Sequence, residues 1–91
     1  MSILDEALDI TSNNRMEDYG HPKHNFNDIA RLWNSYIKNK VMGGDSEITP
    51  KDVSLMMVLF KVAREQGGHK RDNLVDMAGD ARTAAMIEGI E

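Results

Sequence analysis

Residues 53–63 read V-S-L-M-M-V-L-F-K-V-A, and nine of these eleven residues are apolar. A helix on a protein surface shows one apolar stripe, whereas a helix that is apolar nearly all round is surrounded by other elements. The run is too short, and too interrupted by charge, to span a membrane. It therefore predicts the central helix of a small all-α domain, over about residues 50–66.

The residues on either side of this run carry start and stop signals for a helix. Thr49 can cap the helix, Pro50 suits its first position, and Asp52 stands where the acid of a capping box reaches back. Gly67 and Gly68 end it. Two apolar stripes then run along the helix and indicate two packing partners. One stripe is Val53, Met56, Met57 and Phe60, continued by Arg64, and the other is Leu55, Leu59 and Val62.

Three other segments have helical patterns that suit a cover for the central helix. A short helix capped by Ser2 is expected to stop at the polar residues 11–14, whose side chains compete for backbone hydrogen bonds. A second helix runs from Pro22 to about Lys40. A last helix starts near residues 70–72. Its expected packing face is Leu74, Ala78, Ala81 and Ala85.

The chain length predicts one helical domain over residues 1–91, a bundle of about four helices with the central helix sandwiched. A chain of this size buries a modest fraction of its surface, so its stability margin is thin. Oligomerisation is a common remedy. We therefore expect a homo-oligomer, a dimer or higher, whose chains share one core.

Composition narrows the class of protein. The absence of cysteine excludes disulfides and thiolate chemistry and fits a reducing cytoplasm. The N-terminus lacks the basic and apolar regions of a signal peptide, and no segment suits a membrane. With a net charge of −4 and scattered basic residues, the chain lacks the basic face of a nucleic-acid-binding domain. We expect a cytoplasmic protein.

Lys61 and Arg64 lie one helical turn apart on the central helix and need anions if they are buried. Phosphates are one interpretation. The other is structural: Lys61 extends to solvent and Arg64 pairs with a carboxylate of the last helix.

Three carboxylates, Asp72, Asp76 and Asp80, recur at every fourth position of the last helix. Such a row can hold Mg²⁺, which binds carboxylate oxygens and keeps waters for phosphates. A solvated helix face is the simpler alternative.

The segment over residues 15–25 combines a bidentate cation, an aromatic ring, imidazoles and an amide. This mixture suits a nucleotide, with the base on the ring and phosphates on the cation and imidazoles. A structured turn that sets the angle between two helices is the alternative. The residues concerned are Arg15, Tyr19, His21, His24 and Asn25.

Together these residues resemble a family of small proteins carried by phages and prophages. Its members share an Arg-x-x-x-Tyr-Gly-x-Pro-x-x-Asn-Phe segment, an Ile-Ala-x-Leu-Trp helix, a Thr-Pro-x-Asp-Val start, a Lys-x-x-Arg pair and an Asp-Asn-x-x-Asp-x-Ala-Gly tail. The matching residues here are Arg15, Tyr19, Gly20, Pro22, Asn25, Phe26, Ile29, Ala30, Leu32, Trp33, Thr49, Pro50, Asp52, Val53, Lys61, Arg64, Asp72, Asn73, Asp76, Ala78 and Gly79.

The family is similar in size and helical make-up to the MazG-like nucleotide pyrophosphohydrolases. Those enzymes hydrolyse nucleoside triphosphates to monophosphate and pyrophosphate, with Mg²⁺ held by E-E-x-x-E and a later E-x-x-D. This chain has D-E-x-x-D at residues 5–9, D-x-x-x-D at residues 72–76, and Asp80 where an aromatic residue is expected. The resemblance therefore implies nucleotide binding more firmly than catalysis.

The resemblance and the residue types together give a candidate site. Its substrate-binding residues would be Arg15, Tyr19, His24, Asn25, Lys61, Arg64 and Asn73, with Asp72 and Asp76 as Mg²⁺ ligands. The alternative is a non-enzymatic protein that binds a host or phage factor, or that sequesters a nucleotide without cleaving it. If the chain is such an interaction protein, the same charged residues form a structural network, and the Met-rich central helix builds the interface with the host or phage factor.

Overall fold

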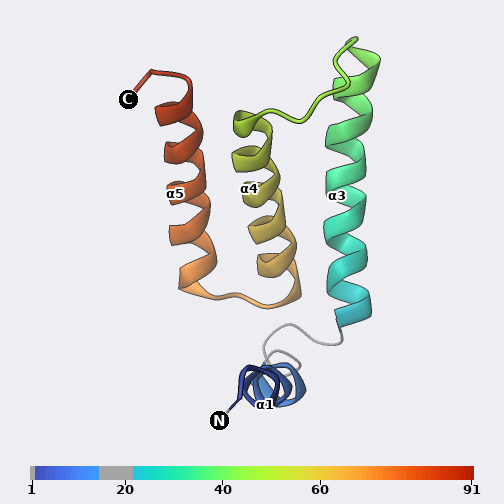
Figure 1. Ribbon diagram of the computed structural model, residues 1–91, viewed down its shortest axis with the longest axis vertical. Coiled ribbons are helices and arrows are strands. Elements are labelled where there is room, and N and C mark those ends of the chain that lie inside the picture. Colours follow the sequence, from blue (N-terminus) through green and yellow to red (C-terminus); the bar gives the residue numbers. More distant parts are fainter. Residues whose placement is uncertain (1, 15–21) are drawn as a thin grey trace.

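The computed structural model describes residues 2–14 and 22–91, and these ranges are helical throughout, apart from turns and helix ends (Figure 1). No strand occurs in them, which confirms the all-α prediction. The elements are α1 (Ile3–Asp9), the π-helix η1 (Ile10–Asn14), α3 (Pro22–Met42), α4 (Pro50–Gly67) and α5 (Arg71–Ile87).

The central helix α4 lies between α3 and α5, so it has the two packing partners that were predicted (Figure 1). One of the predicted stripes is not fully covered, because Val53 and Met57 are exposed. On the α3 side, the indole Nε1 of Trp33 donates a hydrogen bond to the carbonyl of Met56 at 2.7 Å. Among the described residues α3 and α5 do not pack on each other. The three long helices therefore form a single layer rather than a closed bundle.

Two capping boxes set the starts of α1 and α4. The Thr49 hydroxyl accepts from the backbone N–H of Asp52 at 3.3 Å, and the Asp52 carboxylate accepts from the backbone N–H of Thr49 at 2.8 Å. Ser2 and Asp5 make the same reciprocal pair at the start of α1. Both predicted N-caps are confirmed, because this motif is local in sequence.

The predicted end of the first helix was wrong. The chain stays helical after Asp9, as η1. The Thr11 hydroxyl donates to the carbonyl of Ala7 at 2.7 Å. The polar side chain thus bonds back along the helix instead of stopping it, a use that Thr side chains also have.

The predicted packing face of α5 was also wrong. Leu74 is 51% exposed, whereas Asn73 and Ala84 are buried against α4. Polar contacts between α4 and α5 explain the rotation, since Asn73 reaches Glu65 by a hydrogen bond. The exposed apolar face consists of Leu74, Ala78 and Ala81, with Ala85 half-buried.

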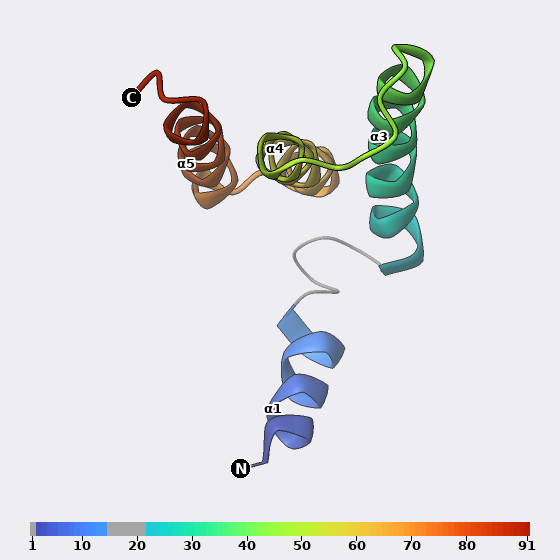
Figure 2. The same cartoon turned by 45° about the horizontal axis from the view of Figure 1, so that its top comes forward.

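The core of the layer is small. Its buried apolar residues are Ile29, Ala63 and Ala84. The chain exposes 6605 Å², against about 5300 Å² for a compact monomer of its mass. Helix α1 packs only on η1 within the described residues and stands away from the layer (Figure 2). None of the described helices is long and apolar enough to cross a membrane.

Candidate functional site

The described members of the predicted site come together at one end of the layer. The N-terminal turn of α3, the C-terminal half of α4 and the N-terminal half of α5 meet there (Figure 1). We call this group the polar cluster. It consists of Asn25 on α3, Lys61, Arg64 and Glu65 on α4, and Asn73 and Asp76 on α5.

Lys61 joins α4 to α5. Its Nζ lies 2.8 Å from Oδ2 of Asp76, and both side chains keep contact with solvent, Asp76 being 46% exposed. An ion pair between α4 and α5 is therefore made by Lys61, which the sequence analysis had expected to extend to solvent. An ion pair this exposed contributes roughly 0–1 kcal/mol to stability.

Arg64 is 8% exposed, and its guanidinium carbon lies 4.8 Å from the centroid of the Phe60 ring. The Nζ of Lys61 lies 5.4 Å from the same ring. One aromatic ring therefore attracts two cations, an interaction that the ring quadrupole favours. Both cations thus lie near this ring, and Lys61 is also paired with Asp76.

Two asparagines hold α3 and α5 against α4. The buried Asn25 donates through Nδ2 to the carbonyl of Ala63 at 3.1 Å. Its Oδ1 is buried and has no hydrogen-bond partner among the described residues. Asn73, also buried, donates to Oε1 of Glu65 at 3.2 Å. A buried acceptor without a partner is costly, which marks Asn25 as a polar group in the cluster with capacity to bind.

The carboxylate of Glu65 contacts several polar groups at the turn between α4 and α5. His69 contacts its carboxylate, the backbone N–H of Lys70 donates to it at 3.1 Å, and Asn73 donates as well. The His69 contact, followed by the bonds from Lys70 and Asn73, holds the pKa of Glu65 below its usual value. Glu65 thus anchors the start of α5, a role that the sequence did not reveal.

The predicted Mg²⁺ ligands lie one helical turn apart on α5. Asp72 is exposed and has no partner among the described residues, whereas Asp76 is held by Lys61. The residues that the structure describes contain no group of three or more acidic, His or Cys side chains placed to hold a metal. Two carboxylates suffice for Mg²⁺ only when phosphates and water complete its shell.

The remaining predicted residues come from the segment before α3. Arg15, Tyr19 and His21 lie outside the described residues. His24 is exposed in the first turn of α3, next to Asn25.

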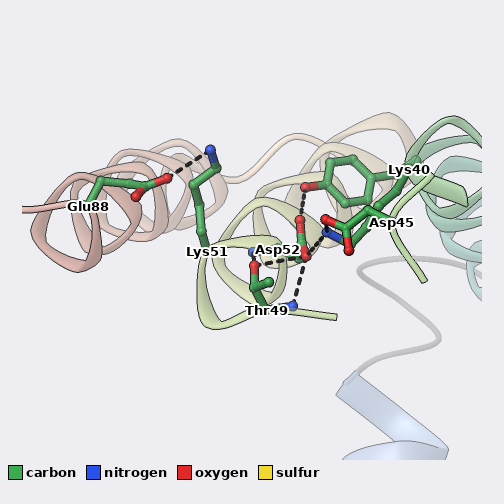
Figure 3. Close-up of polar contacts among 7 residues, drawn as sticks. Lys40, Asp45, Thr49, Lys51, Asp52 and Glu88 are labelled. Carbon is green, nitrogen blue, oxygen red and sulfur yellow. Dashed lines mark hydrogen bonds and ion pairs between the residues drawn. The ribbon is translucent and has the colours of Figure 1, made fainter. Parts of the chain in front are cut away.

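A second polar group, which sequence reasoning missed, lies at the opposite end of the layer (Figure 3). Asp52, 4% exposed, accepts a hydrogen bond from the Tyr36 hydroxyl at 2.5 Å and lies 2.6 Å from Nζ of Lys40. Lys40 also contacts Asp45 at 3.0 Å. Tyr36 and Lys40 are one helical turn apart beside the apolar stripe of α3, and this spacing was the available signal.

The pKa values in this second group follow from its contacts. The Lys40 ammonium, then the Tyr36 hydroxyl and the Thr49 backbone N–H, hold the pKa of Asp52 far below its usual range. The hydrogen bond that the Tyr36 hydroxyl donates to Asp52 in turn raises the pKa of Tyr36. Asp52 is thus a firmly ionised carboxylate that ties the end of α3 to the start of α4.

A surface cavity of about 340 Å³ lies beside this second group. On its far side Lys51 of α4 pairs with Glu88, just after α5, at 2.8 Å (Figure 3). Every charged side chain that lines the cavity has an ionic partner within it. The lining therefore holds the helix ends together, and we assign it a structural role. The lining residues are Lys40, Asp45, Thr49, Pro50, Lys51, Asp52, Ile87 and Glu88.

Comparison with known proteins identifies the family. The model of a domain of unknown function, DUF6378, matches residues 2–88, so the chain belongs to this family. The Gene 55 protein of Mycobacterium phage D29 is 43% identical over 81 residues, which are 88% of this chain and 49% of the relative. The Gene 55 protein of Mycobacterium phage L5 is 43% identical over 82 residues, 89% of this chain and 49% of the relative.

The chain spans about half the length of these curated relatives. No solved structure matches it. The prediction of a phage family of unknown function is confirmed, whereas the likeness to MazG-like enzymes stays a prediction.

Proposed function

We propose that this member of the DUF6378 family binds a nucleotide at the polar cluster. The observation that carries the proposal is the pair of cations, Lys61 and Arg64, held at one aromatic ring where three helices meet. Paired cations beside an aromatic surface are suited to phosphates and a base. The proposal needs Lys61 to exchange Asp76 for a phosphate, which the partly exposed Lys61 side chain and the 46% exposed Asp76 allow.

The asparagines and aspartates complete the proposed site. The unsatisfied Oδ1 of Asn25 can accept a hydrogen bond from a base amino group or a ribose hydroxyl. When Lys61 turns to the phosphates, Asp76 is released to join Asp72 in holding Mg²⁺. A bound Mg²⁺ would neutralise charge on the phosphates. The proposed site also includes the four other residues that the sequence analysis named as substrate-binding: Arg15, Tyr19, His24 and Asn73.

Binding is proposed ahead of hydrolysis. The MazG-like enzymes use two acidic motifs, whereas the polar cluster offers one pair of carboxylates on one helix. The other acidic pattern, at residues 5–9, lies on α1, which stands away from the layer. The chain would then hold a nucleotide, with cleavage depending on a second acidic group.

A thermal melting series tests binding. Full-length protein is melted with nucleoside mono-, di- and triphosphates and cyclic dinucleotides, each with and without Mg²⁺. Because a ligand of the folded state stabilises it by mass action, about 2.7 kcal/mol at 100 times its Kd, the midpoint should rise with a matching nucleotide. A rise that needs Mg²⁺ favours the pyrophosphohydrolase-like form of the site, and a metal-independent rise favours sequestration.

Two lysine variants, one at each end of α4, test whether the rise in melting temperature comes from binding at the polar cluster. Lys61→Gln should abolish the rise, whereas Lys51→Gln, which removes an ion-paired lysine at the other end of α4, should keep it. No rise with any nucleotide, or an equal rise in both variants, would overturn the proposal.

A second candidate, a non-enzymatic interaction protein, is favoured by the contacts within the cluster. Asn25, Lys61 and Asn73 all bond across helix boundaries, as a structural lock would. Asp76→Asn separates the candidates. A nucleotide site would lose the Mg²⁺-dependent part of the melting shift in this variant. A structural lock would show no nucleotide-dependent shift to lose, and the variant would cost at most about 1 kcal/mol of stability, because the pair is half-exposed.

A further inference from the structure

A groove with aromatic rings in its wall lies between α3 and α4. Its volume is about 230 Å³, and each of the described residues that line it is apolar. Phe26 is exposed, and Trp33 and Phe60 are half-buried, so a ligand can reach these three rings from solvent. The lining residues are Phe26, Ile29, Ala30, Trp33 and Phe60.

Phe60 joins this groove to the two cations of the polar cluster. It lines the groove. The guanidinium carbon of Arg64 lies 4.8 Å from the centroid of its ring, and Nζ of Lys61 lies 5.4 Å from the same point. A ligand whose apolar part enters the groove therefore brings an attached anionic group close to both cations. This order of groups suits a planar apolar ring system that carries phosphates.

The contacts between α3 and α4 place the groove and the polar cluster at the same turns of both helices. Asn25, directly before Phe26 on α3, donates to the carbonyl of Ala63 at 3.1 Å. Ala63 follows Phe60 by one helical turn and directly precedes Arg64 on α4. One ligand can therefore contact the groove and the polar cluster together.

We propose that the groove holds the base of the nucleotide while Lys61 and Arg64 hold its phosphates, and that purines are the favoured bases. This assignment rests on the proposed function and extends it to the base. Stacking on an aromatic ring suits any base, because every base has a π-face. A purine has a larger face than a pyrimidine and buries more apolar surface in the groove.

The groove offers the base contact with rings rather than hydrogen bonds. Among the described residues that line it none is charged, and the indole N–H of Trp33 is already bonded to the carbonyl of Met56. The size and stacking of the base therefore decide its affinity more than the groups on its edge. Adenosine and guanosine triphosphates should both bind more tightly than cytidine and uridine triphosphates.

The single tryptophan of the chain makes the groove observable, because Trp33 is one of its lining residues. Full-length protein with Mg²⁺ is titrated with adenosine triphosphate, cytidine triphosphate or inorganic triphosphate, and its fluorescence is corrected for absorption by the nucleotide. Adenosine triphosphate should change the Trp33 emission and bind more tightly than cytidine triphosphate. Inorganic triphosphate, which has no base, should bind and leave the emission unchanged.

A variant that removes one ring tests the base contact. Phe26→Ala should raise the Kd for adenosine triphosphate at least about fivefold, the effect of losing a stacking contact, and should leave the Kd for inorganic triphosphate unchanged. Leu74→Ala, at an apolar residue of α5 that is 51% exposed, is the matched control and should change neither value. Calorimetry measures each Kd and circular dichroism the helical content. Phe26→Leu, which removes the ring and keeps an apolar side chain, serves if Phe26→Ala does not fold.

The groove assignment and the proposed function fail in different ways. Adenosine triphosphate might bind through Lys61, as Lys61→Gln would show, yet leave the Trp33 emission and the Phe26→Ala affinity unchanged. That result would overturn the groove assignment alone. Equal affinities for adenosine and cytidine triphosphates would overturn the preference for purines. If none of the three probes binds, both the assignment and the proposed function are overturned.

Discussion

Asp52 is a buried carboxylate that the surrounding residues keep ionised. It receives hydrogen bonds from Tyr36 and Thr49 and an ion pair from Lys40, which together lower its pKa. A carboxylate whose pKa is lowered by folding stabilises the protein at pH values above its unfolded pKa. That stabilisation is lost as the pH falls toward the folded pKa.

The first residue-scale prediction concerns acid stability. In the wild type, the melting temperature should fall as the pH decreases below about 4, the usual pKa of Asp. Asp52→Asn should melt lower at neutral pH and should lose much of this acid dependence, since Asn does not titrate. Melting curves from neutral pH to about pH 2 measure both effects. An unchanged acid dependence in Asp52→Asn would show that other carboxylates control acid unfolding.

The contacts of Asp52 also show which interactions could be predicted from the sequence and which could not. The pairing of Thr49 with Asp52 was predicted, because the two residues are three positions apart in a recognisable motif. The contacts of Asp52 with Tyr36 and Lys40 were not, because they join α3 to α4 across a turn. Such contacts depend on the relative rotation of two helices, which no local pattern specifies.

At the scale of the element, two helices share one type of N-cap but differ in their packing. Ser2 begins α1 and Thr49 begins α4, each with a complete capping box. Helix α4 packs on both sides, whereas α1 packs only on η1 within the described residues. The same local motif should therefore have different effects on global stability.

This difference gives an element-scale prediction. Thr49→Ala should cost about 1 kcal/mol of unfolding free energy, the usual loss for an N-cap. Ser2→Ala should leave the global unfolding transition unchanged, because α1 can fray without disturbing the layer. Urea titrations of both variants compare the two losses. Equal losses would mean that α1 packs on the layer in solution.

The elements also show which helix features were predictable. The bounds of α3, α4 and α5 followed from Pro22, the Thr49–Pro50 start and paired glycines, which act locally. The buried face of α5 did not, because the sequence marked Asn73 only as a ligand-binding candidate, whereas it is buried and contacts Glu65 of α4. In this molecule polar contacts, and not the alanine stripe, set the rotation of α5.

At the scale of the whole molecule, the chain is a layer with a small apolar core and polar groups at both ends. The group around Asp52 satisfies its own charges. The polar cluster differs, because it holds two cations near one aromatic ring and a buried acceptor without a described partner. Sequence reasoning placed Asn25, Lys61, Arg64, Asn73 and Asp76 in one site, and the structure brings them to one end of the layer.

The described residues place only part of the predicted site, since Arg15 and Tyr19 lie outside them. Nucleotide binding at this end of the layer is therefore tested on the full 91-residue chain. A bound nucleotide changes the chemical environment of the residues that it contacts. The side-chain amides of Asn25 and Asn73 in the polar cluster would report such a change.

A nitrogen–proton correlation spectrum, titrated with the nucleotide that gives the largest melting shift, is the most direct test. The account predicts that the largest changes fall on the side-chain amide of Asn25 and on the backbone amides around Lys61, Arg64 and Asn73. Changes centred on Thr49, Lys51 and Glu88 at the other end of the layer would contradict it, as would an unchanged spectrum at millimolar nucleotide.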